Sequence, residues 1–142
     1  MFLQYPGEID HPANIRLREN GARIMGFPSS DHIEATQILR YQAGQYYHAH
    51  PDYFSPNDHN NLDRGGQRIA SLITWLNDVP EGGETWFPLQ DLKVKPKRGM
   101  AVVFPVGFTH PHEVLATKSR RYILQTWITD PDLLVFHRDE MD

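Results

Sequence analysis

The sequence contains no cysteine. This absence excludes a disulfide framework, thiolate zinc sites and thiol nucleophiles. An excess of basic residues is also missing, because 14 Lys and Arg stand against 18 Asp and Glu and give a net charge of −4. A surface of this charge does not attract nucleic-acid phosphates or an anionic membrane, so we expect neither as a partner.

Long hydrophobic runs are absent as well. No stretch approaches the roughly 18 apolar residues of a membrane-spanning helix, and the opening segment MFLQYPGEID has neither the basic nor the apolar region of a signal peptide. We therefore expect a cytoplasmic protein. The remaining composition, with 39% hydrophobic and 23% charged residues in 142, predicts a single domain over residues 1–142 with a core at about 33–129.

One helix is expected near the N-terminus, where apolar residues recur at helical spacing over residues 13–25. Asp10 is a suitable N-cap, and Pro12 fits the first turn. Gly26 and Pro28 are expected to end the helix.

Most of the remaining chain favours β-strands. Residues 33–41 alternate with period two, and the nearly all-apolar segment 69–76 is typical of a central strand buried on both faces. The polar stretch 55–67 reads as a loop. Further strands are expected at 45–52, 85–87, 92–94, 100–104, 112–115 and 122–128. Seven or eight short strands predict a mainly β sandwich, jelly roll or small barrel.

The sharpest chemical feature is His50-Pro51-Asp52. In an extended chain the side chains of residues i and i+2 project to the same face, so this imidazole and carboxylate can reach one cation. Proline between them holds the preceding residue in the β region, which lowers the entropy cost of orienting the pair. His48 is a less favoured alternative to His50, because it lies four residues from Asp52.

A third ligand is expected from the segment His110-Pro111-His112. Two histidines and one carboxylate form the facial triad of non-haem Fe(II) oxygenases, which leaves three coordination positions open. By residue pattern alone, His112 is favoured and His110 stays an alternative.

A cation lies further along the chain. Arg121 shares one face of the last expected strand with Ile123, Gln125 and Trp127, so its guanidinium is expected to point inward and to need an anionic partner. A dicarboxylic co-substrate would satisfy it, with one end on the metal and the other on the guanidinium. The alternative is an edge arginine that extends into solvent.

These residues resemble the prolyl 4-hydroxylase-like Fe(II)/2-oxoglutarate-dependent dioxygenases. HxD, GGETxFP, and HEV followed nine residues later by a basic residue occur in family order and form a strong combined signal. The resemblance spans nearly all of residues 38–128, and the matching segments are ILRYQAGQYYHAHPDYF, RIASLITWLNDVPEGGETWFP and GMAVVFPVGFTHPHEVLATKSRRYILQTWI.

The resemblance implies a double-stranded β-helix of jelly-roll type with the N-terminal helix packed on its outside. It implies that the iron ligands are His50, Asp52 and His112. It further implies that the co-substrate is bound by Arg121, Tyr41, Trp127 and Ser71, with Arg121 on the distal carboxylate of 2-oxoglutarate.

The implied activity is hydroxylation of prolyl residues in a peptide or protein. The implied cofactor is Fe(II), the implied co-substrates are 2-oxoglutarate and O2, and the co-products are succinate and CO2. Ascorbate is a further candidate cofactor. The alternatives are another side chain or a free amino acid as the target, or a non-catalytic metal-binding β-sandwich. Relative to the family, the chain is expected to be shortened at its N-terminus, and it has arginine at a position where collagen- and cell-wall-type enzymes commonly have lysine.

Overall fold

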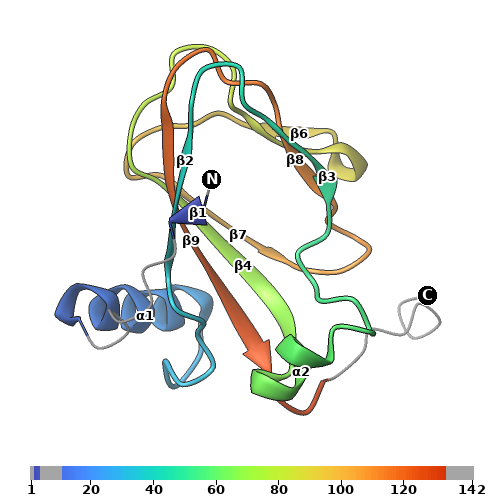
Figure 1. Cartoon of the computed structure of the whole chain (residues 1–142). Helices are drawn as coiled ribbons and strands as arrows, with labels where there is room; N and C mark the ends of the chain where they lie inside the picture. The colour runs from blue at the N-terminus through green and yellow to red at the C-terminus, as the bar shows by residue number, and fades with distance from the viewer. Residues whose placement is uncertain (1, 4–10, 134–142) are drawn as a thin grey trace.

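The computed structural model describes residues 2–3 and 11–133, and Figure 1 shows their arrangement. Its elements in chain order are β1 (Phe2–Leu3), α1 (Pro12–Met25), β2 (Gln37–Tyr41), β3 (Tyr47–His50), α2 (His59–Gly65), β4 (Gln67–Trp75), β5 (Thr85–Phe87), the 3-10 helix η1 (Pro88–Gln90), β6 (Leu92–Val94), β7 (Ala101–Pro105), β8 (His112–Val114) and β9 (Arg121–Asp130).

The strands form two antiparallel sheets. A five-stranded sheet has the order β1-β2-β9-β4-β7 and is called the major sheet below; a four-stranded sheet has the order β3-β8-β5-β6 and is called the minor sheet. In Figure 1 the long strands β4 and β9 run through the major sheet, and the short strands of the minor sheet lie at the upper right. The chain passes repeatedly from one sheet to the other, which confirms the expected mainly β jelly roll.

The main core lies between the two sheets. Its buried residues come from both of them and are Leu39, Ile73, Trp75, Phe87, Phe104 and Ile123. As the apolar segment 69–76 predicted, β4 is a central strand, hydrogen-bonded to β9 on one side and to β7 on the other. This core holds the inward faces of β4 and β9 opposite the minor sheet.

Helix α1 packs on the outside of the major sheet, as expected. Its buried Ala22 contacts Ile33 and Ile128, and Arg18 donates a hydrogen bond to the carbonyl of Ile33 (3.1 Å) in the segment that leads to β2. Gly26 ends the helix in the left-handed conformation, as predicted. The N-cap, however, is His11, whose Nδ1 accepts from the Ala13 amide; Asp10 lies outside the described residues.

Two details of the sequence prediction were wrong. The stretch 55–67 is not all loop, because it contains α2, which is capped by the Asp58 side chain and anchored by the buried Leu62. The described residues also hold nine strands rather than seven or eight.

Within the described part of the chain, no helix is long and apolar enough to cross a bilayer.

The turn between α2 and β4 requires glycine. Gly66 has φ +79°, and a Cβ there would overlap the carbonyl oxygen of Asp130. Gly99 has nearly the same φ, +80°, and a Cβ added there would meet no atom within 4 Å. Gly99→Ala is therefore a control for a positive φ without a steric overlap.

We expect Gly66→Ala to destabilise the fold far more than Gly99→Ala. A left-handed alanine costs about 1–2 kcal/mol, which is the loss expected at Gly99. At Gly66 the overlap adds to backbone strain of about 1–3 kcal/mol, so we expect a total loss above about 3 kcal/mol. Urea unfolding measures both values, and equal losses would contradict the close approach of these two segments.

Candidate active site

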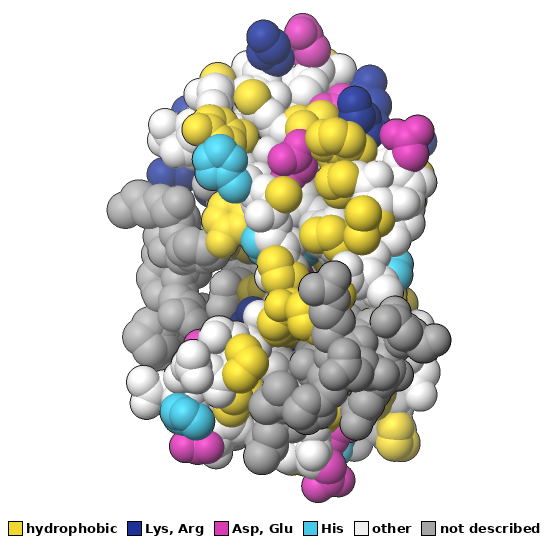
Figure 2. Space-filling model, turned by 90° about the vertical axis from the view of Figure 1, so that its right-hand side faces the viewer, with side chains coloured by type: hydrophobic (Ala, Val, Ile, Leu, Met, Phe, Trp, Pro, Cys, Tyr) yellow, Lys and Arg dark blue, Asp and Glu magenta, His cyan; other side chains and the backbone are white. Residues whose placement is uncertain are grey.

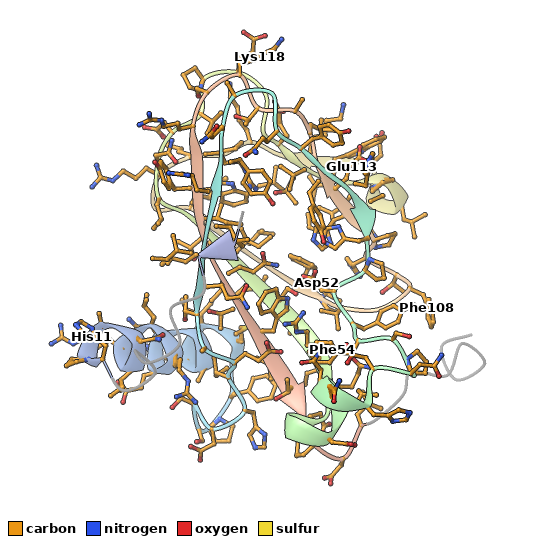
Figure 3. All side chains as sticks on the ribbon, viewed as in Figure 1. His11, Asp52, Phe54, Phe108, Glu113 and Lys118 are labelled. Atoms are coloured by element: carbon orange, nitrogen blue, oxygen red, sulfur yellow. The ribbon has the colours of Figure 1, made fainter. Side chains whose placement is uncertain are left out.

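Three potential metal ligands converge at the end of β3. His50 Nε2 lies 3.4 Å and His112 Nε2 lies 3.8 Å from Oδ1 of Asp52. One ligand atom from each of these residues lies within 4.8 Å of the others, and they are the one such group of three among the described residues. The spacing predicted from the sequence therefore brings the expected triad together. Figure 3 shows Asp52 on the segment that follows β3, between the two sheets.

The minor sheet positions both imidazoles. His50 and His112 face each other in the β3–β8 register, with ring centroids 4.5 Å apart. Nδ1 of His50 lies 2.7 Å from the carbonyl oxygen of His48, and Nδ1 of His112 lies 3.4 Å from that of His110. A carbonyl oxygen only accepts, so each contact favours a proton on Nδ1 and leaves Nε2 as the ligand atom.

The two alternative histidines lie outside the triad. His48 is exposed, and its ring contacts Tyr46 edge-on at a centroid distance of 4.9 Å. The His110 ring contacts the Thr109 hydroxyl, with 2.8 Å between Nδ1 and Oγ1. Both supply backbone carbonyls to the triad histidines instead of ligand atoms.

Burial and neighbouring charges set the ionisation of the ligands. Burial alone would raise the pKa of Asp52, but interactions with His50 and His112 and hydrogen bonds from Ser71 and Trp127 hold it well below its usual range. Burial, opposed by the charge of Asp52, lowers the pKa of His112. The carboxylate is thus ionised and His112 neutral at pH 7, which are the forms that bind a metal.

The second carboxylate oxygen of Asp52, Oδ2, accepts hydrogen bonds from three residues of the major sheet. Oδ2 accepts hydrogen bonds from the Ser71 hydroxyl (2.6 Å), the Trp127 indole N–H (3.0 Å) and the Gln125 amide (3.3 Å). The sequence resemblance assigned Ser71 and Trp127 to the co-substrate pocket. The structure places both on Asp52; Trp127 also lines the cavity, and Ser71 is not among the residues that line it.

Arg121 is completely buried at the start of β9, with an exposed fraction of 0%. Its Nε donates to the carbonyl of Gly83 (2.9 Å) and its Nη2 to the hydroxyl of Thr85 (3.1 Å). The guanidinium carbon lies 4.9 Å from the centre of the Tyr41 ring. Burial lowers the pKa of Arg121 to about 10, with Tyr41 acting in the opposite direction, so the guanidinium stays charged at pH 7.

One donor of this guanidinium has no partner. Nη1 of Arg121 is buried and makes no hydrogen bond to the described residues. None of the ion pairs found among the described residues involves Arg121. A buried cation with an unused N–H is costly unless an anion completes its hydrogen bonds, and a carboxylate is the natural partner. The alternative of a solvent-directed edge arginine is excluded by its burial.

A cavity of about 410 Å³ joins the triad to Arg121. Tyr41 is part of its wall, and burial, opposed by the charge of Arg121, raises the pKa of the Tyr41 phenol. The phenol is therefore neutral at pH 7 and can donate a hydrogen bond. A molecule in this cavity can contact the metal ligands and the guanidinium at the same time.

The sequence analysis missed Arg68, which lies at the site. Arg68 forms a two-point ion pair with Glu34 (2.6 and 2.7 Å) and lies over the rings of Trp127 and Phe54. Its Nη1 also contacts the backbone carbonyl of Asp52 at 3.4 Å. No local pattern marks Arg68, because its partners are distant in sequence.

Comparison with known proteins agrees with this geometry. A family profile described as the 2OG-Fe(II) oxygenase superfamily matches residues 36–129, which is more than half of the 142 residues. The chain therefore belongs to the 2OG-Fe(II) oxygenase superfamily. Iron and 2-oxoglutarate are the metal and co-substrate for which that superfamily is named.

Within the superfamily the chain is prolyl 4-hydroxylase-like. It is 44% identical over 117 residues to prolyl 4-hydroxylase 1 of Arabidopsis thaliana, in a match that covers 73% of this chain and 40% of that protein. Prolyl 4-hydroxylase 2 of the same plant is 39% identical over 99 residues, with 55% and 32% covered. The chain thus spans less than half the length of these relatives.

Solved structures of the same type are also similar. A viral collagen prolyl hydroxylase from Paramecium bursaria Chlorella virus-1, determined as a 2OG complex, has a TM-score of 0.66 at 28% identity and covers 90% of this chain and 76% of that chain. A Pseudomonas putida prolyl-4-hydroxylase shares the fold, with a TM-score of 0.64 at 23% identity and coverage of 91% and 70%.

The residues present fit an iron ion and a 2-oxo dicarboxylate. Two imidazoles and one carboxylate oxygen are ligands that suit Fe(II) and leave open positions. The unpartnered Nη1 of Arg121, in a wall of the same cavity, fits a distal carboxylate.

Proposed function

We propose that this chain is an Fe(II)- and 2-oxoglutarate-dependent dioxygenase that hydroxylates prolyl residues in a peptide or protein. The observation that carries the proposal is the pairing, in one cavity, of the His-Asp-His triad with a buried guanidinium that has a free donor. A structural metal site would have no use for such a carboxylate-binding group and would use a fourth protein ligand.

Each residue has a defined part in this activity. His50, Asp52 and His112 would hold the iron, and Arg121 would bind the distal carboxylate through Nη1 and thereby orient the 2-oxo acid toward the metal. Bound iron and 2-oxoglutarate supply the oxidising chemistry that attacks an unactivated C–H bond. The buried ring of Trp127 and the neutral phenol of Tyr41 line the cavity and limit the entry of water.

Aromatic side chains next to the metal ligands favour a peptide substrate. The rings of Tyr53 and Phe108 contact each other with centroids 5.2 Å apart, and Phe108 is 40% exposed. Tyr47 contacts the His50 ring and is also exposed. Figure 3 places Phe108 on the side of the molecule that Figure 2 shows face-on, where hydrophobic side chains gather along the middle. Exposed aromatic surfaces bind proline-containing extended segments.

The test is anaerobic loading with Fe(II) and 2-oxoglutarate, followed by O2, with succinate measured as the readout. We expect proline-containing peptides to stimulate succinate formation and to gain one oxygen atom at proline, with ascorbate sustaining turnover. Matched peptides with alanine in place of proline, and free L-proline, are the controls.

The outcomes separate the parts of the proposal. Absence of succinate from folded, iron-loaded protein would overturn the assignment as an enzyme. Succinate that depends on a free amino acid, or oxygen added to a different side chain, would overturn the peptidyl-proline assignment alone.

A further inference from the structure

We infer that Ser71, Gln125 and Trp127 act together as positioning residues that hold Asp52 in one orientation, with Oδ1 available to the metal and Oδ2 withheld from it. These three residues are called the Asp52 clamp below. The inference rests on the proposed function, since it takes the His-Asp-His triad as an iron site.

The hydrogen bonds to the two oxygens of Asp52 are strongly unequal. Oδ2 receives three donors at 2.6, 3.0 and 3.3 Å, although a carboxylate oxygen has only about two lone-pair directions. Oδ1 has only the Nε2 atoms of His50 and His112 near it among the described side-chain contacts. Rotation of the carboxylate would break three hydrogen bonds in a site where Asp52 is only 7% exposed, so the orientation is fixed.

The clamp comes entirely from the sheet that does not carry the histidines. Ser71 lies in β4 and Trp127 in β9, and the two face each other in the β4–β9 register. Gln125 lies two residues before Trp127, on the same face of β9. The imidazoles are positioned by β3 and β8 of the minor sheet, whereas the carboxylate between them is positioned by the major sheet.

This arrangement has a consequence for coordination. A carboxylate with two free oxygens can chelate a metal through both of them. If Asp52 did so, the triad would occupy four of the six octahedral positions. With Oδ2 held by the clamp, Asp52 would offer a metal Oδ1 alone, which would leave room on the same ion for the co-substrate.

Gln125 and Trp127 both line the cavity as well as bonding Asp52. Ser71 is fully buried and does not line it. Trp127 also supports Arg68, whose guanidinium carbon lies 3.7 Å from the indole ring centre. Because of this contact, Trp127→Phe is an informative change: it removes the indole N–H and keeps an aromatic ring for Arg68.

The experiment measures Co(II) binding to the purified chain without turnover, by competition titration and by the visible absorption bands of the bound ion. Ser71→Ala, Trp127→Phe and Gln125→Met each remove one donor and keep a similar or smaller volume. We expect each to lower Co(II) affinity by about 10- to 100-fold, the usual range for partners of a metal ligand, and to shift the absorption bands because the carboxylate is free to rotate.

A matched control is available on β9, the strand that carries Gln125 and Trp127. Thr126 is buried, and its hydroxyl bonds to that of Thr36, on the side away from Asp52. Thr126→Val therefore removes a buried hydroxyl and a hydrogen bond, as Ser71→Ala does, without touching the ligand. We expect Thr126→Val to reduce thermal stability while Co(II) affinity and absorption bands stay as in the unaltered chain.

The results are decisive in each direction. If the unaltered chain binds Co(II) and the three variants keep its affinity and spectrum, the clamp is overturned and the proposed function stands. Changes in Thr126→Val as large as those in Ser71→Ala would also overturn the clamp, because they would show a general effect of destabilisation. If the unaltered chain binds no Co(II), the iron site and the clamp fail together.

Discussion

Replacing Arg121 by methionine is expected to raise the 2-oxoglutarate concentration needed for half-maximal turnover by about 30- to 4,000-fold. Removal of one partner from a buried, hydrogen-bonded charge pair costs about 2–5 kcal/mol, and each 1.4 kcal/mol is a factor of about ten. Iron affinity should change little, because Arg121 touches Gly83, Thr85 and Tyr41 and none of the metal ligands. Succinate formation against 2-oxoglutarate concentration, together with iron titration, measures both quantities.

Two further variants sharpen this experiment. Arg121→Lys keeps the charge but loses the planar fork that bonds Gly83 and Thr85 at once, so we expect an intermediate requirement for 2-oxoglutarate. Arg120→Met removes the neighbouring exposed cation and should leave the requirement unchanged. A parallel loss of iron affinity in Arg121→Met, or an equal effect of Arg120→Met, would contradict the assigned role of the guanidinium.

Asp52→Ala is expected to abolish turnover and to weaken iron binding by more than about 100-fold, beyond the range seen when only a partner of a ligand is lost. The change removes the sole anionic ligand and leaves the Ser71, Gln125 and Trp127 donors without their acceptor. Isothermal titration with Fe(II) under anaerobic conditions measures the affinity, and succinate release measures the turnover.

The controls for Asp52→Ala test charge and position separately. Asp52→Asn keeps the shape but presents a neutral group, so it should also lose most of the iron affinity. Asp63→Ala removes an exposed carboxylate on α2 and should change neither quantity. Retention of normal iron affinity in Asp52→Ala would show that the ion binds elsewhere.

The sequence predicted the parts of this fold that depend on local periodicity. Residues 85–87 and 92–94 are strands with the expected bounds, and the apolar run at 69–76 lies, except for Leu76, in the central strand β4. Helix α2 was missed because its seven residues are too few to be stable alone and are rich in turn-forming types. It forms because Leu62 is buried in the folded protein, a tertiary contact that no local pattern reveals.

For the candidate site, too, the sequence predicted what local patterns reveal and missed contacts between distant segments. His50 and Asp52 were found because two residues in an extended chain share a face, and Arg121 because it shares a strand face with Trp127. The family motif then supported His112 over His110. Hydrogen bonds from Gln125 to Asp52 and from Arg121 to Gly83 join residues 73 and 38 positions apart. Such contacts depend on strand register between distant segments, which single-sequence patterns do not specify.

The ligands lie on β3 with the segment that follows it and on β8, and the hydrogen bonds that orient Asp52 come from the opposite sheet. No short piece of this polypeptide therefore forms the metal site by itself. The metal site is assembled when the two sheets pack together around an apolar core that includes Trp75, Phe87 and Phe104. Metal capture therefore follows folding here, in contrast to small zinc modules whose collapse is driven by the ion itself.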